Sequence, residues 1–316
     1  MSARALFGAI EAGGTKFVCA AGYGPLDLRP DLHEVIPTTS PAATLAAVAG
    51  FFDRVCRSAG ELAGIGVAAF GPVDIDRRSS TWGSILGTPK PGWSGVSLVA
   101  PLARFGCPIG LDTDVNAAAL AEARLAAEPG VDSLVYVTVG TGIGGGAVVG
   151  GRTIGGMLHP EMGHIRVRRH ARDQHFAGIC PFHGDCLEGL ASGPAIRARW
   201  GSELAALPAE HPGVEIIGDY LGQLAATLAL ITSPASIVFG GGVMNERLLP
   251  HIRSAAARDL AGYLPVETRA GGFEHLIVGP RLAEKSGIIG AMLLAIGRDG
   301  HPDGIESGTR GRAYGR

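Results

Sequence analysis

The most restrictive feature of the sequence is a glycine turn that joins two strand-like segments near the N-terminus. Residues 6–11 have the pattern of a buried strand, Gly13 and Gly14 form the turn, and the apolar residues 17–21 indicate a second strand. A P-loop or a dinucleotide fingerprint opens a helix after its glycines, so the segment fits neither class. The Walker spacing also fails, because no glycine lies five residues before Gly14. We therefore expect a β-hairpin whose turn receives a nucleotide phosphate.

The same arrangement returns later in the chain. A strand at residues 134–139 is followed by a glycine turn at 140–146 and by the start of another strand at 147–149. A third glycine turn, at 239–244, separates a strand from a helical pattern that begins near Asn245 and can pack against an adenine or ribose. A glycine-rich hairpin without a ligand is an alternative for each turn taken alone. Together the turns predict duplicated lobes that face one nucleotide-binding cleft.

Between the turns, helical and strand-like patterns alternate, which favours α/β layers. The helical patterns cover residues 42–58, 115–127, 190–206 and 214–232, and the strand patterns cover 63–70, 107–111 and 275–278. An apolar helix at 284–296 is expected to return to the first lobe. We accordingly place the first lobe at residues 1–115 plus 284–298, the second at 116–283 and a mobile tail at 299–316.

Composition excludes several classes of protein. The formal net charge of −2 offers no basic field for nucleic acid or an anionic membrane. Apolar stretches are interrupted before the roughly 20 residues that a membrane helix needs, and a strand near the N-terminus leaves no room for a signal peptide. Five cysteines are an odd number for a disulfide framework. These features predict a soluble, cytoplasmic protein.

Three polar residues stand where a strand ends and a helix begins: Asp112, Asp114 and Asn116. A helix N-cap is an equal alternative for Asp112 and Asn116. Asp114 is the candidate catalytic base, because phosphoryl transfer needs a carboxylate at the cleft to accept the proton of the acceptor hydroxyl.

A second group of residues has the spacing of a metal site. Cys180, His183 and Cys186 are three residues apart, and His164 can supply a fourth ligand from a neighbouring loop. Structural zinc takes a closed tetrahedral set of this kind. Two buried thiols and a surface histidine are the alternative. The substitute ligands are His159, His170 and His175.

Trp82 and Trp93 lie in a loop rich in proline and glycine at residues 82–93. Aromatic residues in such a loop either face a sugar or fill a lobe boundary, and the sequence leaves both interpretations open. The remaining cysteines are predicted to be small core residues: Cys19, Cys56 and Cys107.

Taken in order, the motifs resemble one family. They are Glu-Ala-Gly-Gly-Thr-Lys, Phe-Gly-Pro-Val-Asp, Thr-Pro-Lys-Pro-Gly-Trp, Asp-Val-Asn-Ala-Ala-Ala, Val-Gly-Thr-Gly-Ile-Gly-Gly-Gly, His-Pro-Glu-Met-Gly-His and Cys-Leu-Glu-Gly. From Leu6 to about Gly297 the chain resembles the ROK family of repressors, open reading frames and kinases, and within it the bacterial fructokinases. The resemblance implies a two-lobed, actin-like ATPase fold of the ribonuclease H-like kind with a central cleft. It also implies Mg²⁺ with ATP, structural zinc and a homodimer.

The resemblance also implies site residues. The ATP-binding residues are Gly13, Gly14, Thr15 and Lys16 in the first turn, Gly140, Thr141, Gly142 and Gly144 in the second, and Gly240, Gly241 and Gly242 in the adenosine site. Asp114 becomes the catalytic base. The substrate-binding residues are Gly71, Asn116, Glu161, His164 and Glu188. The zinc ligands are His164, Cys180, His183 and Cys186, and Glu11 is associated with water-mediated Mg²⁺.

Two positions depart from the general family pattern. Glu11 stands where many members have aspartate, which affects the expected Mg²⁺ geometry. The segment Cys180–Cys186 replaces the pattern Cys-x-Cys-Gly-x-x-Gly-Cys and favours the fructokinase branch over the glucokinase branch. We expect transfer of the ATP γ-phosphate to the 6-hydroxyl of D-fructose, giving fructose 6-phosphate and ADP.

Alternative functions differ in acceptor or in class. Glucose, mannose or an N-acetylated hexosamine is the alternative acceptor. A non-catalytic sugar-sensing protein would keep the zinc loop but lose the base or the phosphate turns, which are all present. A repressor of the family would carry a helix-turn-helix domain before the first turn. Because a strand already begins near Leu6, we expect no such domain. The expected partners are ATP and a hexose, with no nucleic acid and no membrane.

Overall fold

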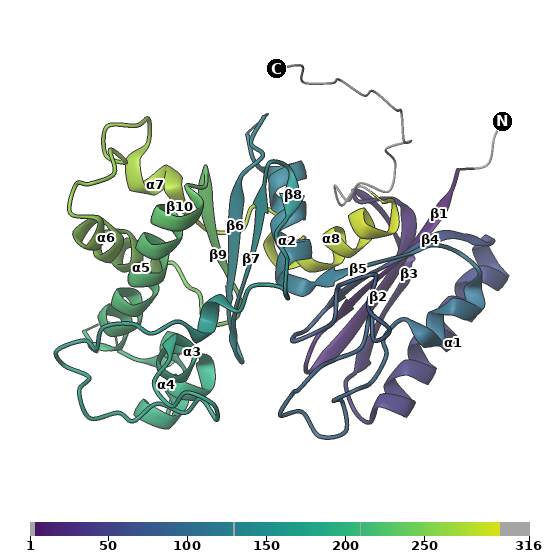
Figure 1. The fold of residues 1–316 in the computed structure, drawn as a ribbon, viewed down its shortest axis with the longest axis horizontal. Coiled ribbons are helices and arrows are strands. Elements are labelled where there is room, and N and C mark those ends of the chain that lie inside the picture. Colours follow the sequence, from purple (N-terminus) through teal and green to yellow (C-terminus); the bar gives the residue numbers. More distant parts are fainter. Residues whose placement is uncertain (1–3, 129, 209, 298–316) are drawn as a thin grey trace, which may run out of the picture.

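Two β-sheets lie side by side, with two helices between them (Figure 1). The computed structural model describes residues 4–128, 130–208 and 210–297. The expected mobile tail at 299–316, like residue 298 at the end of the predicted first lobe, lies outside these residues.

The first sheet has the strand order β3-β2-β1-β4-β5. Its strands are β1 (Leu6–Ala12), β2 (Lys16–Gly24), β3 (Asp27–Pro37), β4 (Leu62–Ala69) and β5 (Ile109–Thr113). β1 pairs antiparallel with β2, as the hairpin pattern predicted, and parallel with β4. Helix α1 (Pro41–Ala59) packs against β2 and β3, and the Ser40 side chain caps its N-terminus.

The second sheet repeats this topology with the order β8-β7-β6-β9-β10. Its strands are β6 (Leu134–Val139), β7 (Ile143–Val149), β8 (Arg152–Thr153), β9 (Ser236–Gly240) and β10 (Ile277–Val278). In both sheets the central strand pairs antiparallel with the strand that follows it and parallel with a strand from much later in the chain. The α/β fold with two similar lobes, predicted from the repeated glycine hairpin, is confirmed.

The outer side of the second sheet carries α5 (Gly213–Thr232), which packs on α6 (Leu248–Leu260). The sequence predicts no apolar stretch long enough to cross a membrane; this prediction is wrong for α5, which is long and apolar enough. In the structure 78% of its apolar window is buried, and Tyr220, Leu221 and Leu224 belong to the main core of this lobe. The apolar character of α5 is therefore explained by burial inside the protein.

Two helices form the layer between the sheets. Helix α2 (Asp114–Ala121) packs on β6 and β7, and α8 (Ser286–Ala295) packs on β1 and β4 and against α2. A Cβ atom on Gly66 would lie 1.8 Å from the carbonyl oxygen of Ala291, and one on Gly290 would lie 2.1 Å from that of Ala117. Glycine at these positions lets helix and sheet backbones approach more closely than any side chain allows.

Several expected elements differ from the structure. Strand β3 has no counterpart in the prediction, because this edge strand mixes charged residues with apolar ones and about half of it is exposed. The helix expected at 190–206 is divided into α3 (Leu187–Ala191), α4 (Gly193–Trp200) and the 3-10 turn Leu204–Ala206. Ser192 interrupts it by capping α4, and Gly201 ends α4 in a left-handed conformation. The strand expected at 275–278 is reduced to β10, since α7 (Gly272–Leu276) precedes it.

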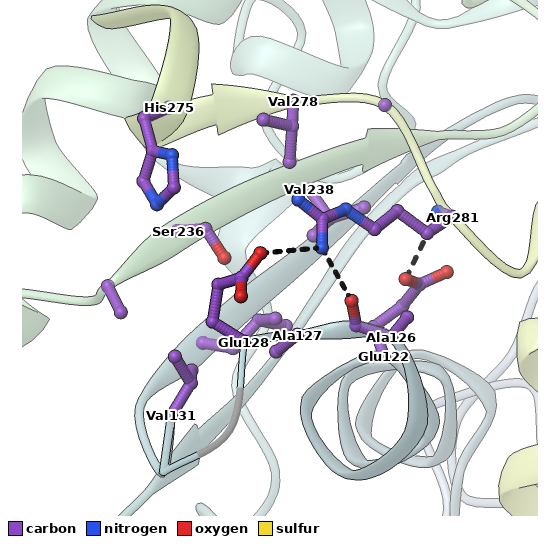
Figure 2. A pocket seen from close by; sticks show the side chains of 13 residues that line it. Glu122, Ala126, Ala127, Glu128, Val131, Ser236, Val238, His275, Val278 and Arg281 are labelled. Carbon is purple, nitrogen blue, oxygen red and sulfur yellow. Dashed lines mark hydrogen bonds and ion pairs between the residues drawn. The ribbon is translucent and has the colours of Figure 1, made fainter. Parts of the chain in front are cut away.

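The C-terminal end of α2 continues as one π-helical turn, Glu122–Ala126, which holds the segment returning to α8 (Figure 2). The Glu122 carboxylate is buried and accepts hydrogen bonds from the backbone N–H groups of Arg281 and Leu282 and from the hydroxyl of Ser286, over 3.1, 3.1 and 2.7 Å. The Arg281 guanidinium donates to the carbonyl oxygen of Ala126. Glu122 thus connects both chain segments that pass between the sheets.

We expect Glu122→Ala to lower the free energy of unfolding by about 1–3 kcal/mol, because two part-buried N–H groups lose their acceptor and the Ser286 hydroxyl keeps only its longer bond to the carbonyl oxygen of Ala283. Urea denaturation measures the change. Glu128→Ala is the matched control: Glu128 is an exposed partner of Arg281 two residues after this turn and should change stability by less than about 0.5 kcal/mol. Equal effects of the two substitutions would contradict the role given to Glu122.

Candidate active site

The parallel strands of the first sheet end at a common edge. Ala12, Ala69 and Thr113 are paired in register as the last residues of β1, β4 and β5. The first glycine turn, the segment around Gly71 and the start of α2 therefore emerge next to one another. Ligands of open α/β sheets bind at this end of the strands.

Asp114 is the first residue of α2 and is partly exposed. One carboxylate oxygen accepts a hydrogen bond from the backbone N–H of Val115 at 2.8 Å. Burial of the carboxyl group, with smaller contributions from the charges of Glu11 and Glu161, raises the pKa of Asp114 to about 7. A carboxylate with a pKa near neutrality has the proton affinity of a good general base.

The other polar residues at the start of α2 have structural roles. The N-cap is Thr113, whose side chain accepts a hydrogen bond from the backbone N–H of Asn116, so neither Asp112 nor Asn116 is the cap. The Asn116 side chain donates to Asp112 and to the carbonyl oxygen of Ile154 and accepts from Ala147. Asn116 has no exposed surface. The prediction that Asn116 contacts the sugar is therefore corrected: this amide joins α2 to β7.

Glu161 reaches the cleft from a loop of the second lobe, beside Gly71 of the first. A Cβ atom on Gly71 would lie 3.4 Å from the Glu161 carboxylate and 3.0 Å from the His159 ring. The backbone N–H of Val73 donates to Nε2 of His159 at 3.1 Å, which ties the two lobes together at this point. Loss of solvent around the carboxyl group and the charge of Glu188 raise the pKa of Glu161 to about 7.

Glu188 lies on α3 and contacts the second glycine turn. Its carboxylate accepts a hydrogen bond from the backbone N–H of Ile143 at 2.9 Å, and a Cβ atom on Gly142 would lie 2.6 Å from it. The turn is shorter than predicted and consists of Gly140, Thr141 and Gly142. Gly144 lies in β7 opposite Thr138 and packs against Val115.

A cavity of about 270 Å³ opens beside this turn. Among its lining residues are three that the sequence predicted for ATP binding, namely Gly140, Thr141 and Gly242. Gly240 and Gly241 are not among the lining residues of this cavity, and both are closely packed: Cβ atoms there would lie 2.3 Å from the Tyr136 hydroxyl and 2.5 Å from the Val139 carbonyl oxygen.

The other lining residues of the cavity were not predicted. They include Gly193, Ile196 and Arg197 of α4 and Glu203 and Leu204 that follow it. The N–H of Gly193 donates to the carbonyl oxygen of Gly140 at 2.8 Å, so α4 begins against the turn. Arg197 and Glu203 form an ion pair at 2.9 Å. The motif Ser-Gly-Pro at 192–194, a capping serine followed by proline in the first helical turn, could have indicated this helix start.

The cavity drawn in Figure 2 is a different feature. It measures about 40 Å³ and lies near Leu134 and Ser236, the first residues of β6 and β9. The glycine turns follow the last residues of these strands, so this small cavity is at the far end of the sheet from the candidate site.

The first glycine turn is exposed at Gly14, Thr15 and Lys16. Thr38 holds the backbone of this turn with two hydrogen bonds. The Thr38 hydroxyl donates to the carbonyl oxygen of Gly13 at 2.8 Å, and the Thr38 N–H donates to the carbonyl oxygen of Thr15 at 2.9 Å. Before the turn, Glu11 accepts a hydrogen bond from the backbone N–H of Ile288, and burial raises the pKa of its carboxyl group while Lys16 opposes the shift.

The four predicted metal ligands lie together. The donor atoms of His164, Cys180, His183 and Cys186 are all within 4.8 Å of one another. The Cys180 Sγ atom is 3.8 Å from Nδ1 of His164 and 3.6 Å from Nδ1 of His183, and Cys186 Sγ is 3.5 Å from Nδ1 of His164. Zn–S and Zn–N bonds of about 2.3 and 2.0 Å in a tetrahedron require separations of roughly 3.3–3.8 Å. The donor set therefore fits zinc, and His159 is engaged elsewhere.

The remaining aromatic and thiol predictions are resolved. Trp93 is fully buried in the first-lobe core, so it fills the lobe instead of facing a sugar. Trp82 is partly buried beneath the guanidinium group of Arg77. Cys19 is buried, Cys56 and Cys107 are partly buried, and all three are free thiols.

Comparison with known proteins agrees with this architecture. The chain is 45% identical over 296 residues to a fructokinase from Zymomonas mobilis, covering 92% of this chain and 96% of that protein. It is 43% identical over 292 residues to a putative fructokinase from Bacillus subtilis, covering 92% and 95%. The crystal structure of a ROK hexokinase from Thermus thermophilus superposes with a TM-score of 0.73 at 29% identity, covering 92% of this chain and 98% of that one. Residues 7–298 match the ROK family, so the chain belongs to this family.

Proposed function

We propose that the protein is an ATP-dependent fructokinase that transfers the γ-phosphate of ATP to the 6-hydroxyl of D-fructose, giving fructose 6-phosphate and ADP. The observation that carries the proposal is Asp114, a carboxylate with a pKa near 7 between the first glycine turn and Glu161. The 45% and 43% identical relatives that are named as fructokinases support fructose as the acceptor.

In this proposal ATP lies across the two glycine turns. Its nucleoside occupies the 270 Å³ cavity between Gly242 and α4, and its phosphates extend past Thr141 towards Gly13 and Lys16. Exposed backbone N–H groups of such turns bind phosphate oxygens. Mg²⁺ bound with ATP supplies charge neutralisation, and Glu11 is the carboxylate at the first turn that would hold it through water.

The sugar is held between the lobes by Glu161, Glu188 and the backbone at Gly71. These groups orient the 6-hydroxyl towards Asp114, which accepts its proton as the oxygen attacks the γ-phosphorus. Holding the two reactants in line converts a bimolecular encounter into an oriented step. His164 is one of the four clustered ligands and follows Glu161 by three residues, so it links the proposed sugar pocket to the metal cluster.

The lobe boundaries at 1–115 plus 284–298 and 116–283 follow the two sheets and remain part of the proposal, as does a homodimer. The five free cysteines fit a reducing compartment, and we place the enzyme in the cytoplasm.

Acceptor choice tests the proposal directly. We expect kcat/KM for fructose to exceed the values for glucose, mannose and N-acetylmannosamine in a coupled assay of ADP release, because the loop Cys180–Cys186 has the fructokinase pattern. Phosphorus NMR should identify the product as the 6-phosphate. A higher kcat/KM for an amino sugar would reject fructose and leave the kinase assignment in place.

The base is tested by Asp114→Asn, which keeps the hydrogen bond from Val115 but removes the proton acceptor. We expect kcat to fall by about 10²–10⁴-fold while calorimetric affinities for ATP and sugar change little. Retained activity with a lowered melting temperature would mean that Asp114 only supports the helix.

The pH dependence follows from the raised pKa of Asp114. A general base works only when it is deprotonated, so kcat/KM should fall with decreasing pH below about 7, approaching tenfold per pH unit. An ordinary aspartate would keep its activity down to about pH 4. A profile that is flat between pH 5 and 8 would argue against Asp114 as the base.

Metal content tests the cluster. We expect about one zinc per chain by elemental analysis, and Cys180→Ala should lose both zinc and sugar affinity because His164 is no longer held. Cys56→Ala is the matched control, since Cys56 is a free thiol outside the cluster. Full activity of a metal-free preparation would contradict a structural role for zinc.

A further inference from the structure

The loop Thr88–Trp93 contacts the first glycine turn through Lys90. The ammonium group of Lys90 donates a hydrogen bond to the carbonyl oxygen of Gly14, across 76 residues of sequence. Gly14 is the tip of the turn, and Thr15 and Lys16 beside it are also exposed. Lys90 therefore places a positive charge where the turn is open to a ligand.

The position of Lys90 is fixed by a buried anchor. Trp93 is fully buried, and its ring centroid lies 5.6 Å from that of Phe17 and 5.7 Å from that of Phe70. The indole N–H donates to the carbonyl oxygen of Thr39 at 3.1 Å. Phe17 is the residue after Lys16, so the anchor is attached to the hairpin whose turn Lys90 covers.

The backbone on both sides of Lys90 is also constrained. Its N–H donates to the Thr88 hydroxyl at 3.3 Å, and its carbonyl oxygen accepts from the N–H of Trp93 at 3.2 Å. Thr38, which holds the turn from the other side, is adjacent to Thr39, the acceptor for Trp93. The loop and the turn thus form one rigid unit with the side chain of Lys90 at its surface.

Lysine is rare in this chain, which makes the placement informative. Lys16, Lys90 and Lys285 are its only lysines, and two of the three lie at the first glycine turn. All other cations of fixed charge are arginines. A lysine ammonium has three donors, and a neutral carbonyl oxygen is a weaker acceptor for them than a phosphate oxygen.

We propose that Lys90 is a catalytic residue that binds the γ-phosphate of ATP and stabilises its charge during transfer. The inference rests on the proposed kinase function. On nucleotide binding the ammonium exchanges the Gly14 carbonyl oxygen for a γ-phosphate oxygen, and it remains protonated throughout. Phosphoryl transfer depends largely on positioning and on neutralising the equatorial oxygens, and cations at these oxygens serve that purpose.

The proposal predicts a difference between nucleotides that carry a γ-phosphate and those that do not. Lys90→Met removes the charge and retains the length of the side chain. We expect its affinity for a non-hydrolysable ATP analogue, measured by calorimetry, to fall by about tenfold or more, with the affinity for ADP changing less than about threefold. With fructose as acceptor, kcat should fall by about 10²-fold.

Two further variants separate charge from structure. Lys90→Arg keeps the cation and should recover a large part of kcat. Arg57→Met removes an exposed cation in the last turn of α1, at the opposite end of that helix from Thr39 and the glycine turn, and should leave kcat and both affinities unchanged. All three variants should unfold at the wild-type temperature, since each side chain lies at the surface.

Two results would overturn the role of Lys90: an unchanged kcat for Lys90→Met, or equal losses of affinity for ADP and the ATP analogue. Wild-type protein that binds the ATP analogue but phosphorylates another sugar would correct only the acceptor, because the binding comparison needs no acceptor. Wild-type protein that binds neither nucleotide would reject both the kinase function and this role.

Discussion

The close contact of α2 and α8 with the sheets determines where every part of the site lies. Gly66 allows the backbone of α8 to pack closely on β4, and Gly290 allows the backbones of α2 and α8 to pack closely on each other. On the second sheet, a Cβ atom on Gly146 would lie 2.3 Å from the carbonyl group of Val115 in α2. Contacts of this kind fix helix position to within a fraction of an ångström, because an added methyl group would collide with backbone atoms. Asp114 begins α2, so the position of the proposed base depends on them.

This packing also has an electrostatic consequence. Glu11, Asp114 and Glu161 come from three separate segments, and each has its pKa raised by removal from water. The charges of Glu11 and Glu161 add to the shift of Asp114. A cleft of this composition is costly to keep fully ionised without compensating cations. Lys16 and Lys90 at the first turn, with the Mg²⁺ that accompanies ATP, supply positive charge on the nucleotide side of these carboxylates.

The sequence was informative wherever a local pattern determined the structure. The glycine hairpins predicted both central strand pairs, and the repeated motif predicted the second lobe. Edge strand β3 was missed because its charged and apolar residues show no regular alternation and its pairing partner, β2, determines it. Residues 190–206 were predicted as one helix, because the prediction used apolar periodicity. Ser192 and Gly201 divide the segment through capping and backbone conformation, which this periodicity does not show.

The surroundings of some site residues were predicted correctly from the sequence and those of others were not. The four metal ligands were found because their spacing is itself the chemical signal. Asn116 was assigned to the sugar because its motif is adjacent to the base, yet two of its three side-chain partners lie 31 and 38 residues away and make it a structural residue. Lys90 was overlooked for the same reason, since the turn that it covers is 76 residues distant. Residues whose partners are remote in sequence gain their roles only from the fold.

Glu188 shows how the separate parts of the proposed site depend on one another. It follows Cys186 by two residues, so the cluster of four ligands fixes the start of α3 and with it the Glu188 carboxylate. The Glu188 carboxylate in turn accepts a hydrogen bond from the N–H of Ile143 at the second glycine turn, so the cluster of four ligands is connected to this turn. Glu188 also raises the pKa of Glu161 across the sugar pocket. A metal ion bound by the four ligands would therefore act on the proposed reaction through position, because Glu188 and the second glycine turn are joined to the loop that it would hold.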